Sequence, residues 1–363
     1  MRVVVAMSGG VDSSVAAGLL VEQGHEVVGI TIKTHRFDDT GGNRGNENSC
    51  CSLDGIRDAR SVAAKLGFPH YVLDFSGRFS DEVIGPFVAE YLAGRTPNPC
   101  VLCNRTIKWE ELLRRADALG ADMIATGHYA NVRTDPQSGR LVLSRGKDGT
   151  KDQSYALWGL TQESLGRTLF PLAAMEKSEV RAWGERNGLV RPAKPESYEI
   201  CFIPDDDYER FLKGRVPGLA GKVDGGEIVM DGEVVGRHRG FPFYTIGQRK
   251  GLGVFRSEPV YVTGIDAERN RIEVGSADRL MARALRASRV NLIKYADCAE
   301  PRRVHTMIRS RDEGAGAILR TLPDGSAEVR FDAPRRAITP GQSVVWYEGD
   351  DVVGGGVIDG VLG

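Results

Sequence analysis

The first two dozen residues constrain the fold of this chain more than any other segment. Arg2–Met7 form an apolar run, the glycine turn SGGVDSS follows, and Ser13–Gln23 place Val15, Leu19 and Leu20 on one helical face. A strand, a tight turn and a helix in this order direct backbone N–H groups outward at the start of the helix, where a phosphate or pyrophosphate can bind. The segment therefore predicts an α/β domain with an anion site after its first strand.

The turn differs from two common nucleotide-binding loops. It matches neither G-x-x-x-x-G-K-[ST] nor G-x-G-x-x-G, which argues against γ-phosphate transfer and dinucleotide binding. Instead it resembles the PP-loop of ATP pyrophosphatases, which cleave ATP between its α- and β-phosphates and adenylate an oxygen. GMP synthetase, argininosuccinate synthetase, tRNA lysidine synthetase and tRNA thiolation enzymes share that loop, so the resemblance leaves the acceptor open. A glycine turn without a ligand is the alternative.

Strands and helices alternate through the first 205 residues. Further strands are expected at Glu26–Ile32, His70–Leu73 and Met123–Thr126, with helices at Ile56–Leu66 and Trp109–Leu119. This alternation predicts a parallel sheet with helices on both faces. Ligands of such sheets bind beyond the carboxyl ends of the strands, where Ser8–Ser14 and Gly127–Tyr129 fall.

Short β-prone runs separated by glycines replace this pattern after about residue 205. The runs lie at Gly226–Met230, Val234–Gly236, Val260–Ile265, Ile272–Val274, Val290–Ile293, Thr306–Ile308, Gly316–Thr321, Ala327–Phe331 and Ser343–Tyr347. We therefore expect three domains: an α/β PP-loop domain at 1–205, a small central β-rich domain at 206–280, and a C-terminal β-barrel at 281–363.

Composition excludes several classes of protein. The chain has 363 residues, of which 41% are hydrophobic, and no run approaches the roughly 18 apolar residues of a membrane-spanning helix. No signal peptide is apparent at the N-terminus, so we expect a cytoplasmic protein without a membrane partner. Net charge is −1, but Met281–Pro340 contain 12 Lys and Arg against 7 Asp and Glu, which predicts a basic C-terminal surface.

Six cysteines are too few for a disulfide scaffold and are better explained as thiols, ligands or redox groups. Cys100 and Cys103 form a C-x-x-C motif. We expect Asn104 to cap a helix that begins near Arg105. This would put Cys103 at a helix N-terminus, where the helix dipole and the nearby Arg105 and Lys108 lower a thiol pKa. A zinc half-site, a redox pair and chance all remain open. Zinc needs a second pair, and the adjacent Cys50-Cys51, even with His128, make a poor chelate.

Seven motifs in order identify a family resemblance over nearly the whole chain. They are SGGVDSS, NPCVLCNRTIKW, ATGHYA, KDQSYAL, SYEICFIP, TIGQRKGLG and TPGQSVVWY. Together they strongly resemble the tRNA-specific 2-thiouridylase family. Members convert wobble uridine 34 of certain tRNAs to 2-thiouridine, using ATP and a sulfur relayed as a protein persulfide. The resemblance thus implies ATP and Mg²⁺ as cofactors, and tRNA and a sulfur-donor protein or persulfide relay as partners.

By matching positions, the resemblance implies a role for each of several residues. Cys201 would carry the persulfide, Cys103 would be the second thiol and end in a Cys103–Cys201 disulfide, and Asp12 would position ATP and magnesium. The implied ATP contacts are Ala6, Met7, Ser8, Gly9, Gly10, Val11, Asp12, Ser13, Ile32 and Gly127. The implied tRNA contacts are Asn98, Pro99, Cys100, His128, Lys151, Asp152, Gln153, Arg309, Ser310, Arg311 and Gln342.

Three alternatives stay open at this point. Some family members have Asp at the position of Cys100, whereas here Cys100, Cys103 and Cys201 form a trio that could hold an iron–sulfur cluster with one open iron. A PP-loop ligase acting on a small metabolite would explain SGGVDSS but not the β domains. A tRNA-binding module without catalysis would leave the intact loop unexplained.

Overall fold

The computed structural model describes residues 1–34, 53–189, 200–203, 205–254 and 256–362. The chain divides into two compact units, one of residues 1–84, 99–206 and 350–352, the other of residues 85–98, 207–349 and 353–363. The three domain limits expected above stay a prediction. No helix within the described ranges is both long and apolar enough to cross a bilayer. Cys50-Cys51 lie outside the described residues.

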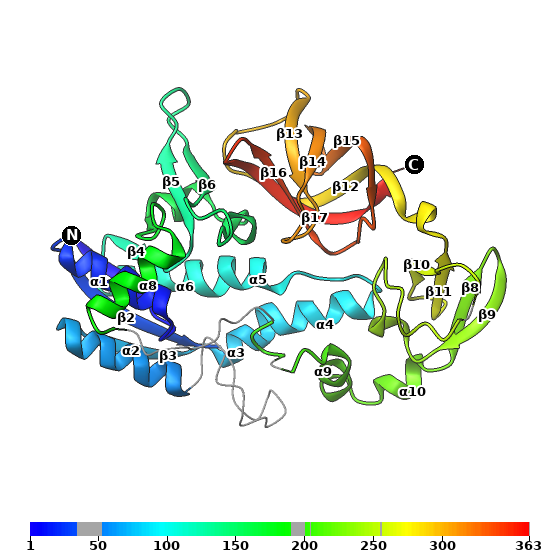
Figure 1. Ribbon diagram of the computed structural model, residues 1–363, viewed down its shortest axis with the longest axis horizontal. Coiled ribbons are helices and arrows are strands. Elements are labelled where there is room, and N and C mark those ends of the chain that lie inside the picture. Colours follow the sequence, from blue (N-terminus) through cyan, green and yellow to red (C-terminus); the bar gives the residue numbers. More distant parts are fainter. Residues whose placement is uncertain (35–52, 190–199, 204, 255, 363) are drawn as a thin grey trace. The chain divides into compact units, whose positions relative to one another are not determined.

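A five-stranded parallel sheet forms the centre of the first unit (Figure 1). Its strands are β1 (Arg2–Ala6), β2 (Glu26–Lys33), β3 (His70–Asp74), β4 (Met123–Ala125) and β7 (Thr168–Leu169). The order β3-β2-β1-β4-β7, with every neighbouring pair parallel, confirms the predicted α/β fold. The chain leaves β3 and returns on the other side of β1, so the topological switch point lies between β1 and β4.

Helices cover both faces of this sheet. The helices of the first unit are α1 (Val11–Glu22), α2 (Leu53–Leu66), α3 (Ser76–Phe79), η2 (Ser80–Ile84), α5 (Pro99–Leu102), η3 (Cys103–Glu110), α6 (Glu111–Ala118), η4 (Ser154–Leu157), α7 (Gln162–Gly166) and α8 (Lys177–Arg186). Ala17 of α1 and Ala59 of α2 pack with Val3 and Val5 of β1 in one buried cluster. Val4 points to the opposite face by strand alternation and is fully buried, and α6 packs against β1 and β4. An antiparallel hairpin of β5 (Ala130–Thr134) and β6 (Leu141–Arg145) completes this unit.

The helix around the C-x-x-C motif begins earlier than expected. It starts at Pro99, passes through the π-helix η3 and continues as α6. Proline suits the first helical position because its missing N–H would be unpaired there anyway. Cys103 therefore lies inside the helix, and Asn104 is buried with its Nδ2 donating to the Ala156 carbonyl (3.0 Å). The prediction that Asn104 caps a helix starting near Arg105 was wrong.

The second unit is mainly β. Its small sheet has the order β10-β11-β8-β9, formed by β8 (Gly226–Met230), β9 (Glu233–His238), β10 (Tyr261–Asp266) and β11 (Arg271–Gly275). Short helices accompany it: α4 (Gly85–Leu92), α9 (Tyr208–Arg215), α10 (Leu219–Val223), η5 (Phe241–Phe243) and η6 (Ala277–Leu280). The ring of Tyr91 from α4 stacks on Tyr208 from α9, with centroids 5.3 Å apart. The segment 85–98 is thereby attached to this unit.

A six-stranded barrel occupies the rest of the second unit, coloured yellow to red in Figure 1. Its strands are β12 (Met281–Leu292), β13 (Arg302–Met307), β14 (Ala315–Thr321), β15 (Ala327–Arg336), β16 (Ser343–Glu348) and β17 (Asp351–Leu362). The order β12-β15-β14-β13-β16-β17 closes through pairing of β12 with β17, which confirms the predicted barrel. Trp346, Leu319 and Val329 are fully buried in its core.

Candidate functional site

The turn after β1 is organised by its own serines. The Ser8 amide donates to Ser13 Oγ (3.2 Å), and the Ser13 and Ser14 hydroxyls donate to the Gly10 carbonyl (3.1 and 2.9 Å). Gly9 adopts φ +75°, and a Cβ there would lie 2.1 Å from the Gly55 carbonyl oxygen, so only glycine fits. The turn is therefore preformed.

The start of α1 is left open for an anion. Gly10 is the N-cap residue and, having no side chain, makes no capping hydrogen bond to the first turn. N–H groups of that turn carry the positive end of the helix dipole. Gly127 approaches this turn so closely that a Cβ would lie 2.7 Å from the Ser13 nitrogen. The loop after β4 therefore packs directly on the helix N-terminus.

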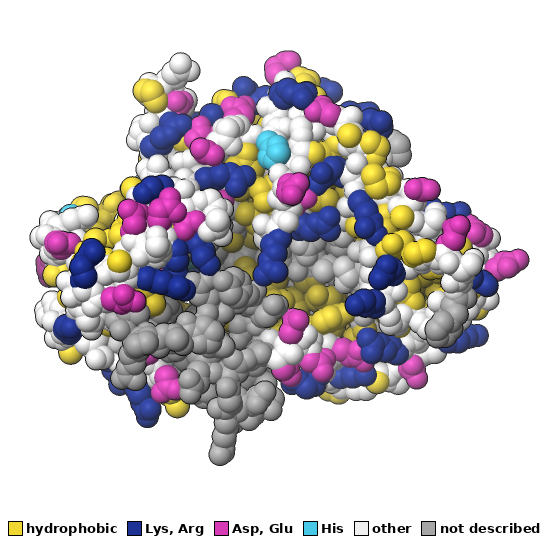
Figure 2. All heavy atoms as spheres, viewed as in Figure 1, with side chains coloured by type: hydrophobic (Ala, Val, Ile, Leu, Met, Phe, Trp, Pro, Cys, Tyr) yellow, Lys and Arg dark blue, Asp and Glu magenta, His cyan; other side chains and the backbone are white. Residues whose placement is uncertain are grey.

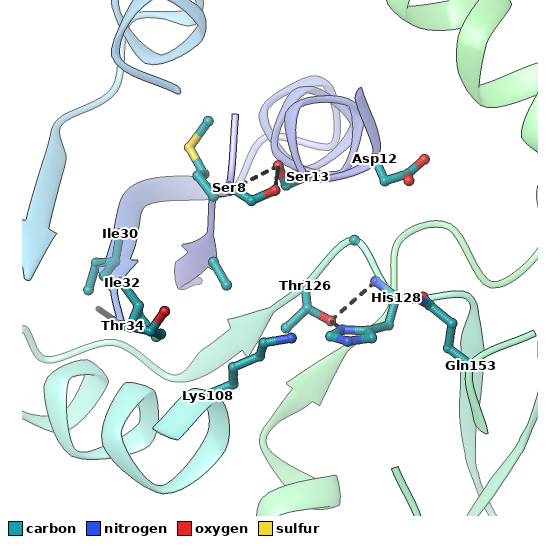
Figure 3. Close-up of a pocket in the computed structure, with 13 residues that line it drawn as sticks. Ser8, Asp12, Ser13, Ile30, Ile32, Thr34, Lys108, Thr126, His128 and Gln153 are labelled. Atoms are coloured by element: carbon teal, nitrogen blue, oxygen red, sulfur yellow. Dashed lines mark hydrogen bonds between the residues drawn. The ribbon is translucent and has the colours of Figure 1, made fainter. Parts of the chain in front are cut away.

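A pocket of about 210 Å³ opens at the carboxyl ends of β1, β2 and β4. It is lined by Ala6, Met7, Ser8, Asp12, Ser13, Ile30, Ile32, Thr34, Lys108, Thr126, Gly127, His128 and Gln153 (Figure 3). Seven predicted ATP contacts thus share one cavity with two predicted tRNA contacts, His128 and Gln153. Gly9, Gly10 and Val11 belong to the adjoining turn.

Asp12 is held in an ion pair. Its Oδ1 and Oδ2 each lie 2.7 Å from Lys177 Nζ, and the Tyr129 hydroxyl donates to Oδ1 (2.8 Å). Figure 3 shows the carboxylate directed away from Ile32 and Thr34. Lys177 is fixed at the start of α8, where its amide donates to Asp148 Oδ2 (2.9 Å). The Lys177 side chain is only 12% exposed, so the pair is well shielded on that side.

His128 is neutral near pH 7. Burial and the nearby Lys108 ammonium group lower its pKa well below the ordinary value of 6.5. Its Nδ1 lies 2.8 Å from Thr126 Oγ1, and its ring lies against Trp109 with centroids 5.3 Å apart. An imidazole held in this way can accept or donate one hydrogen bond in the pocket without adding charge.

The loop that carries the predicted tRNA contacts Lys151, Asp152 and Gln153 adjoins the pocket. Gln153 Oε1 accepts from the Tyr129 amide (3.1 Å). Asp152 is used within the loop, since it accepts from the Ser154 hydroxyl (2.8 Å) and pairs with Arg145 (3.3 Å). Burial raises the pKa of Asp152 despite these interactions. Lys151 is partly exposed. The Asp152 carboxylate therefore makes its contacts with Ser154 of this loop and with Arg145.

The cysteines differ in exposure. Cys100 is exposed, Cys103 is buried, and Cys201 is half-buried. Phe202, next to Cys201, packs edge-on against Phe79 of α3 with ring centroids 5.6 Å apart, and α3 packs against η3, which begins with Cys103. Pro99 is buried and Asn98 is half-buried. Cys201 and Cys103 are therefore held by one group of packed helices.

The predicted tRNA contacts of the barrel fall into two kinds. Arg309, Ser310 and Arg311 are exposed in the turn after β13. Asp312 shapes that turn by accepting from the Ile308 amide (3.0 Å) and pairing with Arg335. In the face shown in Figure 2, Lys and Arg on the barrel alternate with Asp and Glu, so the basic surface is interrupted.

Gln342 is engaged inside the second unit. Its Nε2 donates to the carbonyls of Thr96 (2.9 Å) and Pro97 (3.4 Å), and the Thr96 amide donates to the Pro340 carbonyl (2.9 Å). Thr96 and Pro97 directly precede Asn98 in the chain. The barrel turn that contains Gln342 thus anchors the segment leading to the C-x-x-C motif.

Several residues that line the pocket or contact its lining were missed from the sequence. Ile30 and Thr34 lie two residues before and after Ile32 on or beside β2, so strand alternation could have placed them with it. Lys108 was considered only for its effect on the Cys103 thiol. Lys177 is 165 positions from Asp12, and no local pattern connects the two.

Comparisons with known proteins agree over the whole chain. Family profiles match at residues 1–205 (tRNA methyl transferase HUP domain), 209–276 (tRNA methyl transferase PRC-barrel domain) and 282–358 (Aminomethyltransferase beta-barrel domain). The tRNA-specific 2-thiouridylase MnmA of Salinibacter ruber is 56% identical over 100% of this chain and 95% of its own length. MnmA of Amoebophilus asiaticus is 55% identical over 98% of this chain and 95% of its own length. The chain belongs to the MnmA family of tRNA-specific 2-thiouridylases.

Proposed function

We propose that this protein uses ATP to replace the C2 oxygen of uridine 34 in tRNA by sulfur. The observation that carries the proposal is the pocket at the switch point of the sheet. It joins the SGGVDSS turn to the residues after β4 and opens beside the helix that begins at Pro99. The relatives named tRNA-specific 2-thiouridylase supply the substrate class.

In the first step, the C2 oxygen of uridine attacks the α-phosphorus of ATP and pyrophosphate leaves. This makes AMP a leaving group at an otherwise poor electrophile. The open N–H groups of α1 and the hydroxyl of Ser8 would bind phosphate oxygens, because both are donors at the positive end of a helix dipole. Ile30 and Ile32 offer an apolar wall for the adenine ring.

In the second step, the terminal sulfur of a persulfide on Cys201 attacks C2 and AMP leaves. The thiolate of Cys103 then attacks Sγ of Cys201, the sulfur–sulfur bond breaks, and 2-thiouridine is released beside a Cys103–Cys201 disulfide. A cellular thiol reductant restores both thiols, and a sulfur-donor protein reloads Cys201. The packing of Phe202 on Phe79 supports this assignment, since it keeps the Cys201 segment on the helices next to Cys103.

We favour the persulfide over an iron–sulfur cluster. Within the described ranges, no three His, Cys, Asp or Glu side chains are grouped so that they could hold a metal ion. The three cysteines differ in exposure, since Cys100 is exposed, Cys103 is buried and Cys201 is half-buried. Magnesium would be bound mainly through phosphate oxygens of ATP, because Asp12 is engaged by Lys177.

The test is single-turnover thiolation with unmodified tRNA, ATP and a persulfide donor. We expect AMP, pyrophosphate and 2-thiouridine in equal amounts. Cys201→Ser should keep pyrophosphate release and lose both AMP and 2-thiouridine. Cys103→Ser should keep pyrophosphate and AMP formation but leave the tRNA bound to Cys201 as a mixed disulfide, whereas Cys100→Ser should retain much of the thiolation. Cys298→Ala is the matched control, because that thiol is buried in the barrel core.

Two results would contradict this proposal. Formation of ADP in place of AMP would exclude α,β-cleavage, and AMP formation on a small metabolite without tRNA would indicate a ligase. Anaerobic purification with iron analysis tests the sulfur route. A stoichiometric cluster in active wild type that is absent from an inactive Cys100→Ser variant would replace the persulfide by a cluster.

A further inference from the structure

We propose that Lys108 is a catalytic residue of the adenylation step, whose ammonium group binds the α-phosphoryl oxygens of ATP as pyrophosphate leaves. This inference rests on the proposed function and assigns a role within the same pocket. It concerns a side chain that neither the phosphate turn nor the cysteine motif had marked as a substrate contact.

The position of Lys108 carries the first part of the argument. Lys108 lies on η3 and lines the pocket across from Ser8 and Ser13, and Figure 3 shows its ammonium group extending toward Thr126 and His128. A ligand whose phosphates rest on the start of α1 would therefore have donors on one side and this cation on the other. Such a clamp suits a reaction at the phosphorus between them.

The helix that carries Lys108 is fixed in place. Its neighbours Ile107 and Trp109 are fully buried. The Trp109 indole N–H donates to Thr168 Oγ1 (2.8 Å), which ties η3 to the strand β7. A preorganised cation stabilises developing charge without first paying a reorganisation cost. Because the backbone is fixed, the Lys108 ammonium group can move only by changes of its own side-chain rotamer.

The charges of the residues that line the pocket give the last part of the argument for Lys108. Among the described lining residues, the charged side chains are Asp12 and Lys108. The Asp12 carboxylate is paired with Lys177 and directed aside, and His128 is neutral near pH 7. Among the described lining residues, Lys108 is therefore the positively charged side chain that can contact an anionic ligand in the pocket. Adenylation needs this charge most when the α-phosphorus is attacked.

The experiment compares Lys108→Met and Lys108→Arg with wild type. Lys147→Met is the matched control, because Lys147 is half exposed and pairs with Glu179 (3.1 Å) outside the pocket lining. Single-turnover pyrophosphate release and AMP formation are measured at saturating ATP and tRNA with the persulfide donor present. We expect Lys108→Met to lower both rates on the order of 100-fold. Lys108→Arg should recover at least a tenth of the wild-type rate, and Lys147→Met should match wild type.

Binding measurements distinguish a catalytic role of Lys108 from a role in binding ATP, in binding tRNA or in acting on the Cys103 thiol. Affinity for α,β-methylene ATP should fall less than the rate does, and tRNA affinity should stay within about twofold of wild type. Normal AMP formation with lost thiolation would show that Lys108 acts on the Cys103 thiol and would overturn the proposal. A normal rate once tRNA is saturating would make it a tRNA contact, which also overturns it.

Failure of the proposed function is visible separately, because wild type itself would then form no AMP with tRNA. Thermal unfolding of each variant is recorded first. Should Lys108→Met fail to fold, Lys108→Gln, which keeps a polar end of similar length, supplies the same comparison with Lys108→Arg. Equal AMP formation in Gln and Arg variants would contradict a role for the positive charge.

Discussion

At the scale of single residues, Asp12 shows how a motif residue acts through partners that are remote in sequence. The motif implied a contact with ATP and magnesium, while the structure places the carboxylate between Lys177 and Tyr129. These contacts tie the first turn of α1 to the start of α8 and to the loop after β4. The sequence could predict that Asp12 belongs to the site, but its ion pair depends on tertiary folding alone.

The Asp12–Lys177 ion pair leads to a prediction about two effects that can be measured separately, one on AMP formation and one on the free energy of unfolding. Asp12→Ala should abolish AMP formation and lower the free energy of unfolding by about 1–3 kcal/mol, because a nearly buried ammonium group loses its carboxylate. The double variant Asp12→Ala/Lys177→Met should regain most of the stability without regaining AMP formation. Urea unfolding and AMP assays on the three proteins measure both. Restored AMP formation in the double variant would reduce Asp12 to a structural role.

At the scale of elements, the helix through the C-x-x-C motif was the least predictable. We expected the helix to begin only near Arg105, yet Pro99 occupies its first position. Nothing local marks the change to π geometry in η3. Tertiary contacts explain it, since Asn104 and Trp109 both bond to backbone or side chains of distant segments.

A buried carboxylate holds the end of η3 to its neighbours, and it provides a second prediction. Glu111 is fully buried and pairs with Arg78, Arg114 and Arg115. Burial alone would raise its pKa, but the hydrogen bond and charge of Arg114, with the charges of Arg78 and Arg115, bring that pKa below 4.5. Its stabilising effect is therefore present above pH 4.5 and is lost as the pH falls through the lowered value.

We expect Glu111→Gln to lower the free energy of unfolding by about 2–3 kcal/mol near pH 7, because three arginines lose a buried partner. The variant should also lose less stability than wild type on acidification. Glu82→Gln is the control: Glu82 is about a third exposed, and its pair with Arg78 should be worth under about 1 kcal/mol. Urea unfolding followed by tryptophan fluorescence at two pH values tests this. Equal losses for the two variants would contradict it.

Strands that contain neighbouring β-branched or aromatic residues were predicted well. β1, β8 and β16 have nearly the expected limits, because these residue types favour extended backbone. β17 was missed, although it closes the barrel against β12. Its sequence, DVVGGGVIDGVL, contains four glycines, which weaken any local strand signal. Pairing with β12 overrides this weakness, and pairing partners are not visible in one segment.

At the scale of the whole molecule, the sequence predicted which chemistry the chain carries better than how its groups are arranged. The SGGVDSS turn, Ile32 and Gly127 could be placed together because parallel strands end at one edge of a sheet. The positions of Lys108, Lys177 and Gln342 depend on long-range packing. Gln342 is the clearest case, since the family resemblance implied a tRNA contact and the structure shows its amide bound to Thr96 and Pro97.

The last prediction separates tRNA attachment from positioning within the second unit. Arg309 and Arg311 are exposed, so Arg309→Ala/Arg311→Ala should weaken tRNA binding and flatten its salt dependence. Each lost phosphate contact should reduce the log–log slope by about 0.9 for duplex-like nucleic acid. Gln342→Ala should leave that slope unchanged and lower the rate of thiolation at saturating tRNA, because its two hydrogen bonds fix the residues before Asn98.

Filter binding across a salt series and single-turnover thiolation distinguish these two effects. Arg320→Ala, another exposed barrel arginine, is the control for a change of net charge alone. A salt slope that falls in Gln342→Ala would make Gln342 part of the tRNA surface. A slope that is unchanged in the double arginine variant would place the phosphate contacts on other residues. If both outcomes occurred together, the turn after β13 would have no part in holding tRNA, and the segment that Gln342 anchors would take its place.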